Sequence, residues 1–265
     1  MLLVFKEHLS FYKQILSLAK ADLIKTYRGS FFSWFWAIIK PSITIFVYWF
    51  TFAIGLRVSK VLYGYPYFLW LISGILPWFY IQEILHQGTE SIRKYDYLVT
   101  KMKFPISCIP TFVSISKIII HILLTTIVLF IFVFAGYPLD IYILQLPIYI
   151  LMLFLFFTSI SLLFSVLAAV SKDFLNLVKS SIFALFWLSA IIWDANNISN
   201  PIFVTILKCN PICFLVNGFR NCFIYKTWFW EDKFSLFFFL GLLITVFLLA
   251  CFCYKKLKKD LPDLL

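Results

Sequence analysis

The sequence predicts an all-α polytopic membrane protein with six transmembrane helices, and two observations lead to this fold class. The chain is 63% hydrophobic and only 13% charged, whereas soluble domains contain about 45–50% apolar and about 25% charged residues. Its apolar residues also form long windows, and about 20 mostly apolar residues are needed to cross a bilayer as a helix. The six candidate spans are residues 31–56, 65–82, 106–134, 142–170, 174–193 and 234–254. Because they fill most of the chain, residues 1–265 are predicted to form a single transmembrane domain.

Lysine and arginine are distributed unequally between the two sides of the predicted spans. Fifteen of the 23 lie on the side of the termini and six on the opposite side. Because positively charged loops remain in the cytoplasm, both termini are expected there. The same asymmetry, with attraction to anionic lipid headgroups, accounts for the net charge of +11. The charge therefore predicts a membrane protein and no nucleic-acid partner.

The first 30 residues combine apolar positions with regularly spaced lysines, such as Lys6, Lys13 and Lys20. This pattern predicts a helix in residues 1–30 that lies along the membrane surface, with its apolar face toward lipid. A plain positively charged anchor for the first span is the alternative.

The region 195–233, between the fifth and sixth spans, contains two short apolar runs, Pro201–Leu207 and Pro211–Val216. Each run is about a third of a spanning length, yet too apolar for a free loop. We expect two short re-entrant helices on the outer side, with Asn210 and Asn217 facing protein or water. An ordinary amphipathic outer loop is the alternative.

The segment 91–105 is a polar, basic interruption between the second and third spans, and it ends at a proline. Two or three residues would suffice for a connection, so the length of this segment indicates a contact for something in the cytoplasm. A solvated basic loop is the alternative.

Four ionisable residues are expected at or near membrane depth. Lys117 and His121 are four residues apart and therefore share one face of the third span. A lysine at that depth is costly in lipid and should face the protein interior. Glu83 and His86, near the inner end of the second span, are the expected counterparts. Three interpretations remain open: a buried ion pair, a cationic contact for a passing anionic group, and snorkelling of Lys117 to the interface.

No catalytic or metal-binding motif is present in the sequence. It lacks a phosphate-binding G-x-x-x-x-G-K-[ST] loop, a G-x-S-x-G motif and an H-E-x-x-H motif, and its carboxylates are scattered. The six cysteines include no C-x-x-C pair and are interpreted as small apolar residues; a disulfide among Cys209, Cys213 and Cys222 is left open. Energy for any transport must come from a gradient or a partner.

An ordered series of short motifs extends over nearly the whole chain. It comprises Asp22-Leu23, Lys25, Tyr27-Arg28-Gly29-Ser30, Trp36, Lys40-Pro41, Gly74, Pro77-Trp78-Phe79, Glu83, Gly88-Thr89, Lys101 to Pro105, Asn210-Pro211, Gly218, Arg220 and Trp228 to Asp232. This series resembles the ABC-2 type permeases, the membrane subunits of ABC transporters that export cell-surface polysaccharides, and especially the teichoic-acid translocation permeases. Ser33 is one departure, because many relatives carry glycine there.

The resemblance implies roles for three sets of residues. The first is a coupling helix that receives the motion of an ATPase subunit, with apolar anchors Tyr95, Tyr97 and Leu98 and with Ser91, Arg93, Lys94, Asp96, Lys101 and Lys103. The second is a basic and aromatic segment that leads into a proline-kinked first span, with Lys25, Tyr27 and Arg28. The third is the path of the substrate or an intramembrane charge pair, with Glu83, His86, Lys117 and His121.

The resemblance also implies the partners and the cargo. We expect a homodimer in the bacterial plasma membrane, bound to two cytoplasmic ABC ATPase subunits that hold ATP and magnesium, with no cofactor bound by this chain itself. The implied cargo is a polymer on undecaprenyl pyrophosphate, with teichoic acid as the first expectation and O-antigen, capsule or a rhamnose-rich glucan as alternatives. A membrane enzyme of polymer assembly and a gradient-driven flippase are the competing classes.

Overall fold

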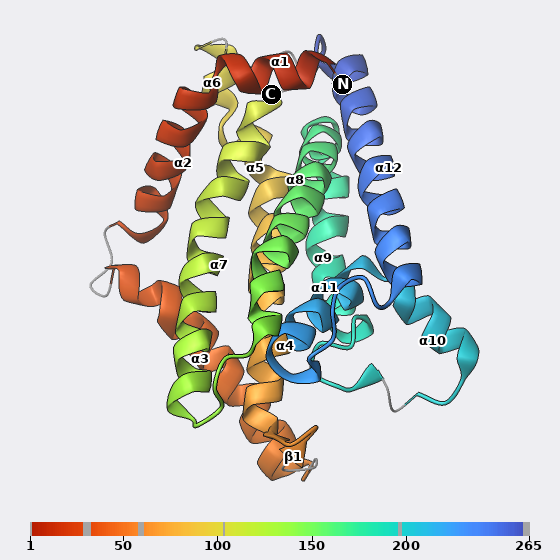
Figure 1. The fold of residues 1–265 in the computed structure, drawn as a ribbon. Helices are drawn as coiled ribbons and strands as arrows, with labels where there is room; N and C mark the ends of the chain where they lie inside the picture. The colour runs from red at the N-terminus through yellow and green to blue at the C-terminus, as the bar shows by residue number, and fades with distance from the viewer. Residues whose placement is uncertain (1, 29–32, 58–60, 103, 196–197, 262–265) are drawn as a thin grey trace.

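The computed structural model describes residues 2–28, 33–57, 61–102, 104–195 and 198–261, and in these residues the protein is built almost entirely from helices (Figure 1). The strands β1 (Val61–Leu62) and β2 (Tyr65–Pro66) form a minimal antiparallel hairpin. Its turn contains Tyr63 and Gly64, both with positive φ, as a tight hairpin turn requires. The predicted all-α class is confirmed.

The helices follow one another along the chain with short connections. They are α1 (Leu2–Ser10), α2 (Tyr12–Tyr27), η1 (Ser33–Phe35), α3 (Trp36–Trp49), η2 (Phe50–Gly55), α4 (Tyr67–Glu83), η3 (Ile84–Gly88), α5 (Thr89–Lys94), α6 (Asp96–Thr100), α7 (Cys108–Phe134), η4 (Ile141–Gln145), α8 (Leu146–Val170), α9 (Lys172–Leu188), α10 (Pro201–Lys208), α11 (Pro211–Arg220), η6 (Asn221–Tyr225) and α12 (Lys233–Leu257).

Five helical segments are each long and apolar enough to cross a membrane: Trp36–Gly55, Tyr67–Lys94, Cys108–Phe134, Ile141–Val170 and Lys233–Leu257. They correspond to five of the six predicted spans.

The predicted fifth span, residues 174–193, corresponds to α9, which has 17 residues. The side chain of Ser171 caps its N-terminus by accepting a hydrogen bond from the Phe174 amide. Ala190, with a φ of 51°, lies in the turn that follows the helix. This segment is therefore shorter than the other spans, and the buried residues Ile191 and Ile192 lead the chain back into the protein.

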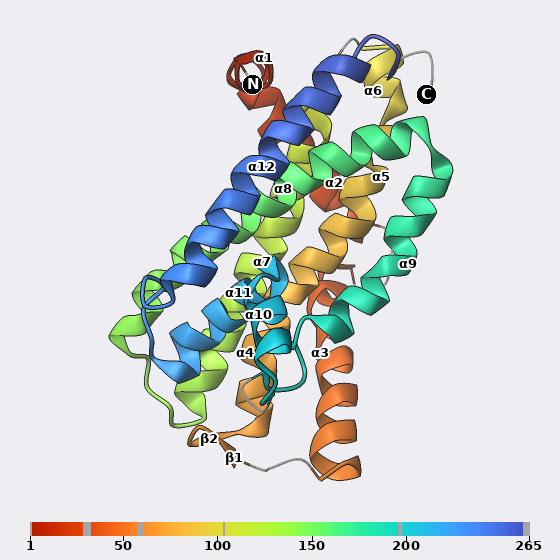
Figure 2. The ribbon, with the colours of Figure 1, turned by 90° about the vertical axis from the view of Figure 1, so that its right-hand side faces the viewer.

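The second span is the centre of the protein. The helices α4, η3 and α5 form one continuous segment of 28 residues, and 78% of its most apolar window is buried, compared with 6% for the first span and 17% for the last. A helix that is apolar on all sides is expected to be surrounded by other helices. Figure 2 shows α9 and α12 on opposite sides of α8, and α9 also packs against η3 and α5 of this central segment.

The N-terminal region forms two helices where the sequence predicted one. The chain breaks at Phe11, so that α1 lies across one end of the protein while α2 runs beside α7 (Figure 1). Glu7 fixes the position of α1, because it accepts hydrogen bonds from Ser107 on the approach to α7 and from Tyr254 and Lys258 at the end of α12.

The structure contains two short helices, α10 and α11, where the sequence predicted them. Asn200 caps α10 and Asn210 caps α11, each followed by a proline at the first helical position, which is a strong signal for a helix start. The pair is bent by 85°. Its entry into the outer leaflet stays a prediction.

The two ends of the protein are formed by different elements. The described ends of the chain lie with α1 and α6 at one end, and β1 lies at the other (Figure 1). The arrangement agrees with the prediction that the two termini share a side. Each of the six cysteines carries a free thiol.

Candidate functional site

The predicted coupling segment is divided between two elements. The helix of the second span continues to Lys94, so that Ser91, Arg93 and Lys94 form its last turn, and only α6 is a separate short helix. Ser91 is buried in the protein. The Arg93 side chain donates hydrogen bonds to the carbonyl oxygens of Ala168 and Ala169, at 2.5 and 2.7 Å. Arg93 thus caps the end of α8, because the last carbonyls of a helix have no partners within it.

Two of the three predicted apolar anchors are wrong. Tyr95 and Leu98 are only 4% and 2% exposed, respectively, because they pack against α7 inside the protein. Tyr97 is 42% exposed and remains available to a partner. The chain breaks between α5 and α6 at Tyr95, so the segment is not the single coupling helix that the resemblance implied.

The exposed surface beyond this break is small and partly basic. Tyr97, Lys101 and Met102 are exposed, and we refer to these three residues as the α6 surface. The carboxylate of Asp96, in the first turn of α6, accepts a hydrogen bond from the Tyr97 amide at 2.7 Å. Lys103, also predicted for this contact, lies outside the described residues.

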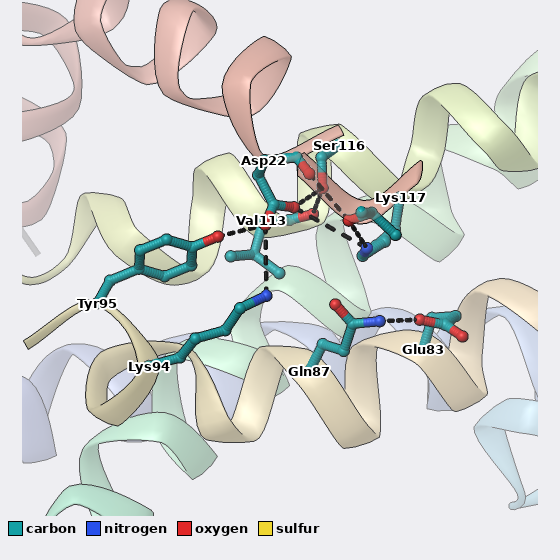
Figure 3. Close-up of polar contacts among 9 residues, drawn as sticks. Asp22, Glu83, Gln87, Lys94, Tyr95, Val113, Ser116 and Lys117 are labelled. Carbon is teal, nitrogen blue, oxygen red and sulfur yellow. Dashed lines mark hydrogen bonds and ion pairs between the residues drawn. The ribbon is translucent and has the colours of Figure 1, made fainter. Parts of the chain in front are cut away.

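The buried lysine of the third span has a different partner from the one predicted. The Nζ atom of Lys117 lies 3.9 Å from Oδ2 of Asp22, and the two side chains are 5% and 1% exposed. The predicted counterpart, Glu83, instead accepts a hydrogen bond from Gln87 one turn further along the same helix. The correction follows from the path of α2, which brings Asp22 against α7 (Figure 3).

Asp22 is the centre of a buried polar cluster (Figure 3). Its Oδ1 atom accepts a hydrogen bond from the Tyr95 hydroxyl and lies 3.5 Å from Nζ of Lys94. Its Oδ2 atom accepts a hydrogen bond from Ser116 and faces Lys117. Burial alone would raise the pKa of Asp22, but these hydrogen bonds and the two ammonium groups outweigh it and lower the pKa below its ordinary value. Asp22 is therefore a carboxylate at neutral pH.

A cavity of about 440 Å³ lies next to this cluster, between α2, α3, α4 and α7. We call it the Lys117 cavity, because Lys117 and Lys40 bring two ammonium groups to its wall. Glu83, Tyr27 and His121 also line it. His121 makes ring contacts with Tyr80 and Phe219, at 5.9 and 5.5 Å between centroids.

A second cavity of about 540 Å³ adjoins the first along the central helix. We call it the His86 cavity, and the two cavities share Gln82, Glu83 and Gln87 in their walls. Of the shared residues, Gln82 and Glu83 end α4 and Gln87 lies in η3, where the helix adopts a wider π-helical turn; such turns occur frequently at functional sites. The aromatic residues of the His86 cavity are Tyr48, Trp78, Phe183 and Phe186, and Lys179 brings an ammonium group to its wall.

Of the three predicted residues in the segment that leads into the first span, Tyr27 reaches the site. Tyr27 lines the Lys117 cavity, and its ring stacks on Trp34 with 5.3 Å between centroids. Burial and the nearby carboxylate of Glu83 raise the pKa of Tyr27 to about 12. Lys25 lies over the ring of Tyr95, whereas the exposed side chain of Arg28 lies outside the described cavity walls. The structure thus brings Glu83, Tyr27, Lys117 and His121 together and keeps Arg28 apart.

Three residues important for these sites were not among the predicted site residues. Lys40 was detectable as the single charge of its span, and Asp22 as one of the two carboxylates in residues 1–30, although neither signal indicates a partner. Arg220 is fully buried beside Trp70, outside the walls of both cavities. Its guanidinium donates hydrogen bonds to the carbonyls of Ala190 and Ile191, and lies 3.6 Å from the ring centroid of Trp70.

The fold and the two cavities define the class: a polytopic helical membrane protein with polar cavities between its spans. A family model described as "ABC-2 type transporter" matches residues 13–224, which is most of the chain. The chain therefore belongs to the ABC-2 type transporter family, as the sequence motifs predicted. Membership of this family implies a partnership with an ABC ATPase.

Curated relatives match over much of their length. The chain is 26% identical over 249 residues to two proteins of Klebsiella pneumoniae, both named "O-antigen export system permease protein RfbA", with 92% of each chain covered. It is 21% identical over 210 residues to a Myxococcus xanthus protein of the same name, with 79% of each chain covered.

Proposed function

We propose that this chain is the membrane subunit of an ABC exporter that moves a lipid-linked cell-surface polysaccharide across the bacterial plasma membrane. The observation that carries the proposal is the pair of adjoining cavities, one lined by two lysines and one rich in aromatic and amide groups, which share wall residues at the end of α4 and in η3. The names of the relatives in Klebsiella pneumoniae and Myxococcus xanthus support a polysaccharide as the cargo.

The Lys117 cavity suits the phosphate end of the cargo. Lys40 and Lys117 supply two positive charges, and Thr26 and Tyr27 supply hydroxyl groups. Hydrogen bonds from charged groups to phosphate are about twice as strong as those between neutral groups. Undecaprenyl pyrophosphate, a lipid with a compact doubly charged head, matches this lining.

The His86 cavity suits the saccharide part. Tyr48, Trp78 and Phe186 offer apolar faces, and Gln82 and Gln87 offer amide donors and acceptors. A binding site that is mostly apolar, with a few polar groups to fix orientation, is the common arrangement for small ligands. Sugar rings present both kinds of surface.

The choice between an O-antigen type of polysaccharide and teichoic acid follows from charge. Teichoic acid carries a phosphate in each repeating unit, whereas the His86 cavity contains the carboxylate of Glu83 beside Lys179 and His86. This mixed and weakly charged lining favours a polymer of mostly neutral sugars. Teichoic acid, expected from the sequence motifs, is therefore the second candidate.

The orientation follows from the charge distribution and the family. The end that carries α1, α6 and the C-terminus faces the cytoplasm, and the α6 surface contacts the ATPase. In a chain with Cys209 and Cys253 changed to serine, an impermeant thiol reagent added to intact cells should label Lys226→Cys and leave Lys255→Cys unlabelled. The reverse pattern would contradict the orientation.

Two copies of the chain form the membrane part. The first span is only 6% buried within one copy and presents a long apolar face, which includes Ile43, Phe46 and Phe50. A second copy would cover part of this face near the His86 cavity. The mass of the purified complex, corrected for detergent, should correspond to two permease chains and two ATPase chains.

The function is tested by changing Lys40, whose side chain lines the Lys117 cavity and forms no described ion pair. A host that lacks the gene should retain a lipid-linked polymer inside the cell, and the unaltered chain should restore surface polymer. Lys40→Met should restore no more than roughly a tenth of it, because loss of one charge-assisted contact costs about 1.5–3 kcal/mol.

The control is Lys226→Met, which removes an exposed lysine outside both cavities and should restore export fully. The ratio of phosphate to sugar in the retained polymer decides between the two cargoes. Normal surface polymer in the Lys40→Met strain would contradict the role of the Lys117 cavity.

A further inference from the structure

We infer that Asp22 is a positioning residue that transmits movement of α6 to the wall of the Lys117 cavity. This inference rests on the proposed function, in which the α6 surface contacts the ATPase and the cavity receives the cargo. The inference assigns a mechanical role to a buried residue of α2, which in this proposal contacts neither ATP nor the cargo.

The two oxygens of the Asp22 carboxylate serve two different sides. Oδ1 is bound by Tyr95 and faces Lys94, the residues where α5 ends and α6 begins. Oδ2 is bound by Ser116 and faces Lys117, both on α7. Figure 3 shows the carboxylate between these two pairs. A displacement of Tyr95 must therefore move the carboxylate or break the hydrogen bond.

The side near α6 is built as a pivot. Tyr95 has a φ of −115° and a ψ of 31°, outside the helical range, and separates α5 from α6. Its ring packs edge-on against Phe112 with 5.0 Å between centroids. Movement of α6 would turn at this residue, and the tyrosine hydroxyl is its contact with Asp22.

Asp22 is also connected directly to residues of the cavity wall. The Nζ atom of Lys117 lies 3.4 Å from Oγ1 of Thr26, and this hydroxyl donates to the backbone carbonyl of Asp22 at 2.8 Å. Both Lys117 and Thr26 line the cavity. A shift of Asp22 therefore changes the position of a cation and a hydroxyl in the cavity wall. Buried charges respond strongly to such shifts, because the surrounding dielectric is low.

A second cluster at the same end provides a matched comparison. Glu7 is bound by a serine, a tyrosine and a lysine, namely Ser107, Tyr254 and Lys258. The chemistry resembles that at Asp22, but these residues join α1 to α12 and none of them lines the two cavities. The Glu7 cluster thus only holds α1 against α12. A substitution in this cluster is therefore a suitable control, because it removes a buried hydrogen bond without interrupting the connection between α6 and the cavity.

The experiment measures two movements in the complete complex with its ATPase, reconstituted in lipid discs. Spin labels are attached through Thr100→Cys on α6 or Thr44→Cys in the cavity wall, each paired with Thr245→Cys on α12, in a chain with Cys209 and Cys253 changed to serine. Distances are compared without nucleotide and with ATP and vanadate. In the otherwise unaltered complex, both distances should change.

Tyr95→Phe should preserve the change at Thr100 and reduce the change at Thr44 by at least half. The control, Tyr254→Phe, should preserve both changes. Asp22→Asn, which keeps the shape but removes the charge, should act like Tyr95→Phe. Unchanged movement at Thr44 in both variants would overturn the inference and leave the proposed function intact. No movement at Thr100 in the unaltered complex would overturn the proposed ATPase contact and this inference with it.

Discussion

Among the described residues, the protein buries the cationic side chains of Lys117 and Arg220, and they are stabilised in opposite ways. Lys117 has a carboxylate partner, Asp22, and lies in a cavity wall. Arg220 has no carboxylate within 4.0 Å in the part of the chain described by the structure, and it is held by two backbone carbonyls and the face of Trp70.

The difference follows from the chemistry of the two side chains. A guanidinium is planar, carries five donors and is weakly hydrated, so two carbonyls and an aromatic face can stabilise it, even though Nε of Arg220 has no hydrogen-bond partner among the described residues. An ammonium is a compact, strongly hydrated charge that needs an anion when it is buried. The site of Arg220 is therefore closed and structural. The site of Lys117 retains a charged group beside a cavity that can receive a ligand.

The largest effect is expected from Arg220→Ala. The change leaves the carbonyls of Ala190 and Ile191 without partners, at about 1–3 kcal/mol each, and it also creates a cavity beside Trp70. We expect a loss of about 5 kcal/mol or more, measured as a lower melting temperature in detergent. Arg220→Lys should recover little, because a lysine cannot reproduce the planar fork. A smaller decrease in melting temperature for Arg220→Ala than for Lys117→Met would contradict the conclusion that the Arg220 site is the structural one.

Lys117→Met should have the second largest effect. Removal of one partner of a buried pair costs about 3–5 kcal/mol, and the lower figure is expected because Lys94 still faces Asp22 at 3.5 Å. Adding Asp22→Asn should restore much of the lost stability, whereas adding Glu83→Gln should not. Thermal unfolding of the single and double variants distinguishes the two partners, and rescue by Glu83→Gln would reinstate the pairing predicted from the sequence.

Gly74→Ala tests how tightly the Arg220 site is packed. A Cβ atom at Gly74 would lie 2.4 Å from Nη2 of Arg220, and the guanidinium cannot move away without losing its carbonyl contacts. Overpacking of this kind costs about 1–3 kcal/mol. The same change in an Arg220→Ala background should cost little, so the coupling of the two changes is the measured quantity. Additive effects would indicate that the site has free space.

The smallest effect is expected from Lys226→Gln. Lys226 pairs with Asp140 at 3.0 Å, but both side chains are largely exposed, and water weakens such pairs. The melting temperature should stay within experimental error of the unaltered protein. A clear decrease in the melting temperature would mean that ion pairs stabilise this protein irrespective of burial. The comparison of the buried cations Lys117 and Arg220 would then lose its basis.

Local patterns in the sequence determined several elements of the fold. The apolar windows located the spans, because a helix in lipid must satisfy its backbone internally and present apolar side chains. The Asn-Pro pairs at positions 200 and 210 located the starts of α10 and α11, because capping depends only on neighbouring residues. These features need no information about distant parts of the chain.

Only the tertiary structure decided which charges meet. Asp22 and Ser116 are 94 residues apart, and the spacing of Lys117 and His121 defined a helix face without naming what faces it. Glu83 was a reasonable partner by depth, yet the path of α2 brought Asp22 closer. The break at Tyr95 likewise turned Tyr95 and Leu98 inward. A sequence records the periodicity of each helix, whereas the partner of a buried charge depends on how separate helices pack together.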